Sequence, residues 1–357
     1  MFTFQIRCNE IKCKFALFEN GVFEMRRDKE MRQIALRVSI ALAAGMFSIV
    51  PVTYGAPVGH EIVKGGASVT YSDAENGGIN TSITSNTTNN IIDWQDFSVA
   101  QGETVQFDNG DKTNNYMNVV TGANTSQING AISGGNEVYI INPNGVIFGE
   151  TASVDVGSLY ASTRGVTDAM KEAIEADGST MESVINTASA GVATDVVNMG
   201  SITANKVVME GQNIRFYSDN VTSTNGVVFK ADAADNGYVH VGNSDGSEVT
   251  DYSSEILTSG STAAALEYYK LVDGTNWSTA INNNLSGNYM LSADIDATDE
   301  ETDFAPITNV FSGKLDGNFH TISNISNANG LFYQTSGAAI ENIESFIPRF
   351  SIAAPLV

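Results

Sequence analysis

Residues 136–149 read NEVYIINPNGVIFG, and this stretch decides how the chain folds. Its two runs of β-branched and aromatic residues predict two short strands. Between them lie Asn142, Pro143, Asn144 and Gly145, which predict a tight turn. Pro143 presets φ at the second turn position, and Asn144 and Gly145 both accept positive φ. We therefore expect very short strands joined by sharp corners.

The same texture continues from residue 57 onward on both sides of this stretch. Short runs such as VTY (69–71), VVM (207–209) and VVF (227–229) alternate with Gly, Asn, Asp, Ser and Thr. Strands so short and numerous favour a β-solenoid over a β-sandwich or barrel, because stacked coils can bury a continuous apolar column. Asn and Gly suit its corners, since both tolerate left-handed backbone angles and Asn side chains can form ladders between coils. The chain is therefore predicted to be all-β.

Three segments depart from this pattern. Apolar residues at spacings of three and four over 166–186 predict a short helical excursion between coils. Residues 243–266 are rich in Gly, Ser, Asp and Thr and predict a linker, after which strand-like runs return over 267–345. Residues 346–357 lose the Asn and Gly punctuation and predict an irregular, truncated tail.

The N-terminal segment predicts an extended signal peptide over residues 1–56. A basic region ends at Arg37, a mostly apolar run covers 34–50, and small residues follow at Gly55 and Ala56. The apolar run is short and interrupted, so no stable membrane span is predicted, although a retained anchor is the alternative. Cys8 and Cys13 are the only cysteines, and both precede the predicted cleavage.

The charge balance argues against nucleic-acid binding. The formal net charge is −23, from 18 basic and 41 acidic residues. Phosphates would repel such a chain, and the sequence has no basic stripe to offset the repulsion.

Residues 59–242 resemble the N-terminal secretion domain of filamentous haemagglutinin-type exoproteins of two-partner secretion systems, and we assign the mature secretion domain to 57–242. The ordered matches are IIDWQDF (91–97), GETVQF (102–107), VTG (120–122), SQING (126–130), the stretch 136–149 and VGSLYAST (156–163). The resemblance implies a right-handed parallel β-helix, export to the periplasm, and passage through an outer-membrane β-barrel transporter. It also implies that the turn Asn142-Pro143-Asn144-Gly145 is important for secretion. A second family element, an Asn-containing motif ending in Leu-Phe, is not evident.

Residues 268–345 carry a second resemblance, to the GLUG-motif repeats of bacterial surface proteins. The similarity includes LDGNFHTI (315–322) and GLF (330–332). It implies about one β-solenoid unit, which must stack on neighbouring coils to be stable.

The sequence offers little for catalysis, so no enzyme, cofactor or metal site is predicted. The histidines His60, His240 and His320 lie in unrelated contexts, and the arginines after residue 57 are widely spaced. A β-helical polysaccharide lyase or hydrolase, which needs clustered carboxylates, is the enzymatic alternative. The acidic residues of 294–303 favour a solvated loop over a calcium site, and Trp94 with Phe97 favours core packing over a binding platform.

The predicted function is that of a secreted or surface exoprotein with an adhesin-like role. Its predicted partners are the outer-membrane transporter and a host or bacterial surface glycan or protein. A surface module that binds a glycan or haem is a further alternative, for which haem would need an axial ligand.

Overall fold

The computed structural model describes residues 3–8, 11–16, 55–75, 77–175, 181–186, 194–232, 237–254, 265–298, 303–325 and 330–345. The chain divides into two units, Met1–Thr53 and Tyr54–Val357. The first contains an antiparallel hairpin of β1 (Thr3–Cys8) and β2 (Ile11–Ala16). Most of the predicted signal peptide, residues 17–54, lies outside the described residues, as does the predicted tail 346–357. Among the described residues, no helix has the length and apolar character needed to cross a membrane.

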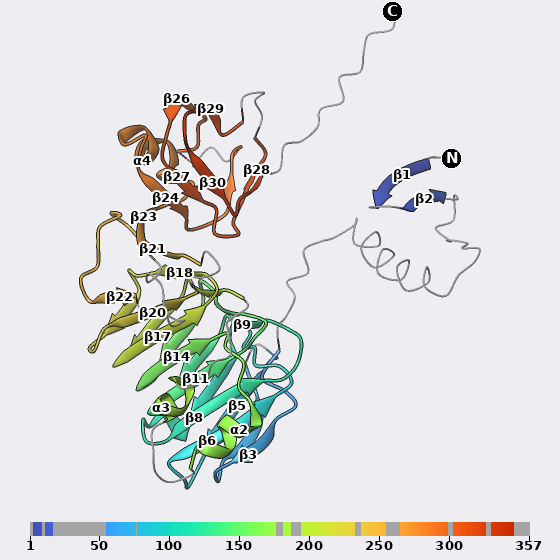
Figure 1. The fold of residues 1–357 in the computed structure, drawn as a ribbon, viewed down its shortest axis with the longest axis vertical. Helices are drawn as coiled ribbons and strands as arrows, with labels where there is room; N and C mark the ends of the chain where they lie inside the picture. Colours follow the sequence, from blue (N-terminus) through green and yellow to red (C-terminus); the bar gives the residue numbers. More distant parts are fainter. Residues whose placement is uncertain are drawn as a thin grey trace, which may run out of the picture. The chain divides into compact units, whose positions relative to one another are not determined.

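The second unit is built from three long sheets whose strands follow one another in turn around each coil (Figure 1). The first sheet has eight strands: β3 (Glu61–Lys64), β6 (Asn89–Trp94), β8 (Asn115–Val120), β11 (Glu137–Ile141), β14 (Ser158–Ser162), β17 (Lys206–Gly211), β20 (Val227–Ala231) and β22 (Tyr252–Ser254). The second has seven: β4 (Ser68–Asp73), β5 (Ile79–Thr84), β7 (Thr104–Phe107), β10 (Ala131–Ser133), β13 (Ser153–Asp155), β16 (Ser201–Ala204) and β19 (Val221–Ser223).

The third sheet has nine strands and runs the furthest along the chain. They are β9 (Ser126–Ile128), β12 (Val146–Phe148), β15 (Val196–Asn198), β18 (Ile214–Tyr217), β21 (Val239–Asn243), β23 (Leu266–Val272), β24 (Asn288–Leu291), β27 (Lys314–Asp316) and β30 (Ala339–Glu341). Strand pairing within the three sheets is parallel except at the N-terminal end, where β3 and β4 pair antiparallel with β6 and β5. The crossovers give a right-handed parallel β-helix, which confirms the predicted fold class.

Stacking in register buries one apolar column, as the solenoid prediction requires. In the eight-stranded sheet, Val138 pairs with Tyr116 of the coil before and Leu159 of the coil after. All three side chains are fully buried, and they belong to a single core cluster that runs from Ile83 to Val241. The apolar residues of each short strand therefore stabilise the fold only because the next coil covers them.

Corner asparagines form the ladder that the sequence predicts. The Asn115 side chain donates to Asn89 Oδ1 at 2.8 Å, and Asn136 donates to Asn115 Oδ1 at 2.8 Å. Each of these asparagine side chains thus hydrogen-bonds to the asparagine of the neighbouring coil, because a side-chain amide both donates and accepts.

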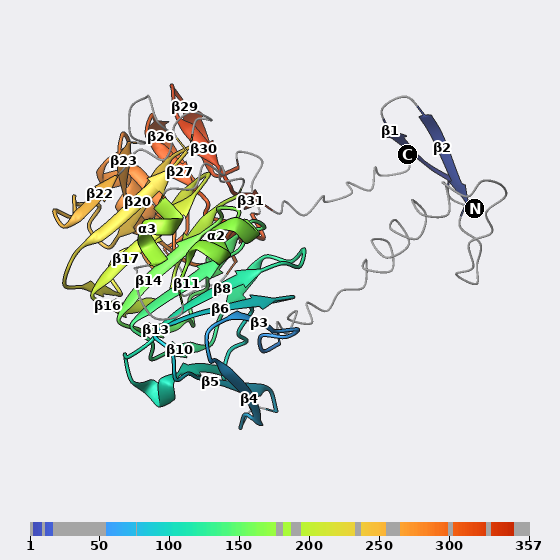
Figure 2. The same ribbon diagram turned by 60° about the horizontal axis from the view of Figure 1, so that its bottom comes forward.

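The helical excursion also lies where it is predicted. Helices α2 (Asp168–Ala173) and α3 (Met181–Asn186) lie over the outer face of the eight-stranded sheet (Figure 2). Ile174, Met181 and Ile185 pack there against apolar side chains of the sheet, including Met117 and Tyr139. The excursion covers apolar residues that would otherwise face water. A 3-10 turn, η2, spans Asp108–Gly110.

A second stack of coils follows the first. It uses the third sheet, a three-stranded sheet of β25 (Ile295–Asp296), β28 (Thr321–Ser323) and β31 (Glu344–Ser345), and a pair of β26 (Ile307–Phe311) and β29 (Phe332–Thr335). Helix α4 (Trp277–Asn283) precedes β24, and the stack has its own core around Trp277. We call residues 266–345 the C-terminal stack.

The range predicted as a linker, 243–266, contains a strand. Strand β22 pairs with β20, and Tyr252 packs edge-on against Phe216 and Phe229. The polar composition of this range conceals a single aromatic residue that extends the core. Residues 255–264 of the range lie outside the described residues.

Candidate secretion turn and surface pocket

The predicted secretion turn forms the corner between β11 and β12. Asn142 is fully buried and Gly145 is buried, while Pro143 and Asn144 are half-buried. Gly145 has φ +114°, a conformation that glycine adopts without strain. Asn144 tolerates positive φ but does not take it here. A hydrogen bond from Gly145 N to Asn142 O, 3.0 Å long, closes the turn.

The Asn142 side chain holds the turn from inside. Its Nδ2 donates to Asn124 O at 2.9 Å and to Ser126 Oγ at 3.0 Å. Its Oδ1 accepts from the backbone N–H of Asn144 at 2.9 Å and from Asn144 Nδ2 at 3.1 Å. A buried amide with these partners stabilises one backbone conformation, because any other would leave polar atoms unpaired.

Neighbouring coils hold the turn from both sides. Asn144 Nδ2 donates to Gly122 O at 2.9 Å, and Thr125 Oγ1 donates to Asn144 O at 2.7 Å, both in the coil before. From the coil after, Thr194 Oγ1 donates to Pro143 O at 2.9 Å. The structure thus brings all four predicted residues together as a rigid corner that contains no titratable side chain.

Two of the three histidines lie where the two stacks of coils meet, which their positions in the sequence do not suggest. His60 is exposed and lies 2.9 Å from the Tyr71 hydroxyl. His240 and His320 are both buried. His240, on β21, lies 2.8 Å from Asp316 of the C-terminal stack, and His320, in that stack, lies 3.5 Å from the Tyr217 hydroxyl on β18. Only a three-dimensional view reveals this proximity, because His240 and His320 are far apart in the chain.

The remaining sequence candidates are mostly structural. Trp94 and Phe97 are fully buried with their rings edge-on, which confirms core packing. In the acidic segment, hydrogen bonds from Asn324 and Thr298 lower the pKa of the Asp296 carboxyl. Asp299, Glu300 and Glu301 lie outside the described residues.

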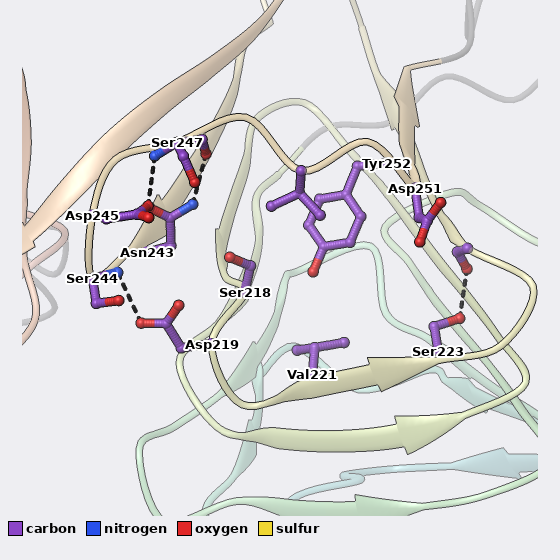
Figure 3. Close-up of a pocket in the computed structure, with 12 residues that line it drawn as sticks. Ser218, Asp219, Val221, Ser223, Asn243, Ser244, Asp245, Ser247, Asp251 and Tyr252 are labelled. Atoms are coloured by element: carbon purple, nitrogen blue, oxygen red, sulfur yellow. Dashed lines mark hydrogen bonds between the residues drawn. The ribbon is translucent and has the colours of Figure 1, made fainter.

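A polar pocket that no sequence pattern predicts lies at the end of the first stack. The seven-stranded sheet ends at β19, and the chain between β21 and β22 passes over that strand and leaves a cavity of about 320 Å³ (Figure 3). Its walls carry Asp219, Asp245 and Asp251, with Tyr252 and Val221 pointing inward. None of its twelve lining residues is Lys, Arg or His.

Local hydrogen bonds organise this pocket. Asp219 Oδ2 accepts from Ser244 N and Asp245 Oδ1 accepts from Ser247 N, each at 2.8 Å. Hydrogen bonds from Ser247 hold the pKa of the Asp245 carboxyl below its usual range, whereas burial raises the pKa of Tyr252 to about 12. At neutral pH the pocket therefore combines acceptor carboxylates with a phenol that keeps its proton.

Comparison with known families identifies the first stack. The model of the TPS secretion domain, where TPS denotes two-partner secretion, matches residues 60–263, more than half of the chain. The chain belongs to this family. The TPS secretion domain is a domain of exported proteins and not an enzyme family. The match includes the turn 142–145, the helical excursion and β22.

Relatives of this TPS chain occur in Haemophilus influenzae. A heme/hemopexin-binding protein from strain Rd is 36% identical over 108 residues, which cover 30% of this chain and 11% of that protein. A second H. influenzae protein of the same name is 38% identical over 73 residues, covering 20% and 8%. The matched segments are therefore only about a tenth of these relatives' length. The crystal structure of the HMW1 secretion domain from H. influenzae aligns with a TM-score of 0.35 and 16% identity, over 81% of this chain and 84% of that one.

Proposed function

We propose that this chain is an adhesin-like exoprotein that an outer-membrane β-barrel transporter exports to the cell surface or medium. The observation that carries the proposal is the TPS secretion domain match over residues 60–263. The stacked coils support it physically, because each coil can dock on the one before as it emerges. The absence of cysteines after residue 13 leaves no disulfide to block threading.

We assign the turn Asn142-Pro143-Asn144-Gly145 to transporter-dependent secretion. In the folded corner the Asn142 amide is buried and bonded to four atoms. A transporter therefore has access to this side chain only before the coil has formed. The turn's role is then either recognition in the unfolded chain or formation of the corner during export.

Co-expression with the cognate transporter tests this assignment. Asn142→Ala and Asn144→Ala are expected to reduce the secreted fraction at least several-fold. Asn115→Ala, which breaks the asparagine ladder between neighbouring coils, is the matched control for a general loss of stability. Secretion of the two turn variants at the level of Asn115→Ala would remove the specific role of the turn.

The domain division follows from the same proposal. Residues 1–56 act as an extended signal peptide, 57–242 as the secretion domain, 243–266 as its connection, 267–345 as a GLUG-like solenoid unit and 346–357 as a tail. Coil geometry supports the solenoid character of the fourth segment, since β24, β27 and β30 stack in parallel.

A glycan-binding role is the second candidate, and the pocket of Figure 3 favours it. Carboxylate, amide and hydroxyl groups around an aromatic ring suit the hydroxyls and apolar face of a sugar. Binding of neutral glycans on an array, lost in Asp219→Asn or Tyr252→Ala, is the expected result. A wild-type chain that binds no glycan on the array would remove this candidate.

Sugar cleavage and haem binding receive less support. A polysaccharide hydrolase needs a carboxyl kept protonated, whereas hydrogen bonds from Ser247 and the nearby Lys270 hold the pKa of the Asp245 carboxyl below its usual range. Haem binding is suggested by the names of the relatives, yet His240 and His320 are buried against protein groups, and the exposed His60 is held against Tyr71. Assays for unsaturated sugar products and for a haem Soret band are expected to be negative.

A further inference from the structure

The junction between the two stacks contains a network of charged and aromatic side chains whose central members, Arg215, His240 and Asp316, are buried. Arg215 on β18 and His240 on β21 come from the secretion domain, whereas Asp316 on β27 and Glu341 on β30 come from the C-terminal stack. His240 Nδ1 lies 2.8 Å from Asp316 Oδ2 and 3.7 Å from Glu341 Oε1. These three ligand-type atoms all lie within 4.8 Å of one another.

Both ring nitrogens of His240 lie within hydrogen-bond distance of polar side chains. The Tyr269 hydroxyl has one proton and lies 3.0 Å from Glu267 Oε2, an acceptor, so it donates there. The same hydroxyl lies 3.1 Å from His240 Nε2, and its oxygen can accept a proton from that nitrogen. In that tautomer the lone pair of His240 Nδ1 faces the carboxylates of Asp316 and Glu341.

The Nδ1 nitrogen of His240 and the carboxylate oxygens of Asp316 and Glu341 form a donor set that a metal ion can take. Without a metal, a proton on Nδ1 can donate to Asp316 Oδ2 across the same 2.8 Å. An imidazole backed by a hydroxyl and carboxylate on its other nitrogen is the arrangement that orients metal-bound histidines in proteins. Tyr238 adds rigidity, since its ring stacks on His240 with centroids 4.1 Å apart.

The local charge also matches a divalent ion. Four carboxylates belong to the network, those of Asp195, Glu267, Asp316 and Glu341, against the two cations Arg215 and Lys314. With a neutral His240 the described network carries a net charge of −2. Arg215 Nε does approach Asp316 Oδ2, at 3.2 Å, but that oxygen has a second lone pair, and Arg215 also pairs with Asp195.

We propose that His240, Asp316 and Glu341 form a zinc-binding site that joins the C-terminal stack to the secretion domain. Nitrogen and carboxylate ligands at about 2.0–2.2 Å suit Zn²⁺, and tetrahedral geometry puts ligand atoms about 3.3 Å apart. The distances of 2.8 and 3.7 Å lie on either side of that value. The Glu341 side chain is 45% exposed, so a water molecule can complete the coordination from that side.

Calorimetric titration of the full chain with ZnCl₂ tests the site. The chain carries Cys8→Ser and Cys13→Ser, which remove competing thiolates, and an affinity tag without histidine. We expect one saturable zinc ion per chain and at least about tenfold weaker binding in His240→Gln and Glu341→Gln. His60→Gln and Glu61→Gln are the matched controls, because both residues are exposed on the N-terminal coil, and both are expected to bind as the parent does.

Two further measurements separate coordination from folding. Glu341→Gln changes an exposed side chain, so its circular dichroism should match the parent even if His240→Gln fails to fold. Tyr269→Phe removes only the hydroxyl behind His240 and should weaken zinc binding by about tenfold. Co²⁺ in place of zinc should give the visible absorption of a tetrahedral site. A parent chain without saturable binding, a Glu341→Gln variant that binds zinc equally well, or a loss of binding in His60→Gln would each overturn the proposal.

Discussion

At the scale of single residues, buried asparagines carry much of the specificity of this fold. A side-chain amide both donates and accepts hydrogen bonds, so it can pair with the backbone at a corner and with the amide of the next coil. Asn142 does the first and Asn115 does the second. An apolar side chain of the same size would leave the backbone groups at these corners unpaired.

Asn142→Ala should lower the free energy of unfolding by about 1–3 kcal/mol, because it leaves buried partners such as Asn124 O without a donor. Urea unfolding of the purified chain measures the change. Asn283→Ala, at an exposed position on α4, is the control and should shift the midpoint little. Equal midpoints for the two variants would show that the buried amide contributes nothing.

At the scale of elements, the helical excursion is anchored to the coils by buried charge. Lys171 on α2 makes an ion pair with Asp93 on β6 at 2.6 Å, and the two side chains are 6% and 19% exposed. Breaking such a pair is costly because the remaining charge stays buried, whereas replacing both members by apolar groups can be nearly neutral.

Asp93→Asn should therefore destabilise the chain by about 3–5 kcal/mol, since it leaves Lys171 without its carboxylate. The double variant Asp93→Leu/Lys171→Met should recover most of that loss. Chemical unfolding followed by tryptophan fluorescence gives both values. A double variant as unstable as the single one would contradict the argument from unpaired charge.

Helix α3 should add a pH-dependent contribution through Glu182. Burial raises the pKa of this carboxyl, but hydrogen bonds from Lys206 and Tyr160 outweigh burial and hold the pKa below its usual range. The folded state therefore binds this proton less tightly than the unfolded state does. Its stabilising contribution is complete above the ordinary glutamate pKa of about 4.3 and is lost as the pH falls through the lower, folded-state value.

Glu182→Gln tests this contribution because glutamine does not titrate. The difference in unfolding midpoint between wild type and Glu182→Gln should be largest near neutral pH and should shrink at acid pH. Urea titrations at several pH values measure it, with Glu61→Gln, on the exposed N-terminal coil, as the control. A difference that stays constant, or grows, toward acid pH would show that the Lys206 and Tyr160 contacts do not favour the carboxylate.

At the scale of the molecule, one sheet runs through both stacks. Strand β23 pairs with β21 of the secretion domain and with β24 of the C-terminal stack. Tyr217, Tyr269 and Met290 pack together across the junction. Separating the two stacks along this sheet would expose apolar surface on both of them.

We therefore expect the two stacks to unfold together, in a single calorimetric transition. Amide exchange should likewise show comparable protection in β21 and β24. Two separated transitions would indicate that the junction contributes little to stability.

The sequence predicts the coil fold well because its signals are local. Short strands, corner asparagines and the turn 142–145 each follow from neighbouring residues, and so does the helical spacing in 166–186. The sequence does not predict strand β22, because Tyr252 is the only apolar residue in that strand. The sequence also does not reveal that the Asn144 side chain bonds the backbone of the preceding coil.

The sequence by itself determined that this protein winds into stacked coils, that its corners use Asn and Gly, and that it resembles exported domains. Only the tertiary structure decided which distant side chains meet. Asp316 is 101 residues from Arg215 and 76 from His240, yet it bonds to both. Which residues of distant coils lie side by side depends on the number of residues in every coil between them. No local sequence pattern contains that information.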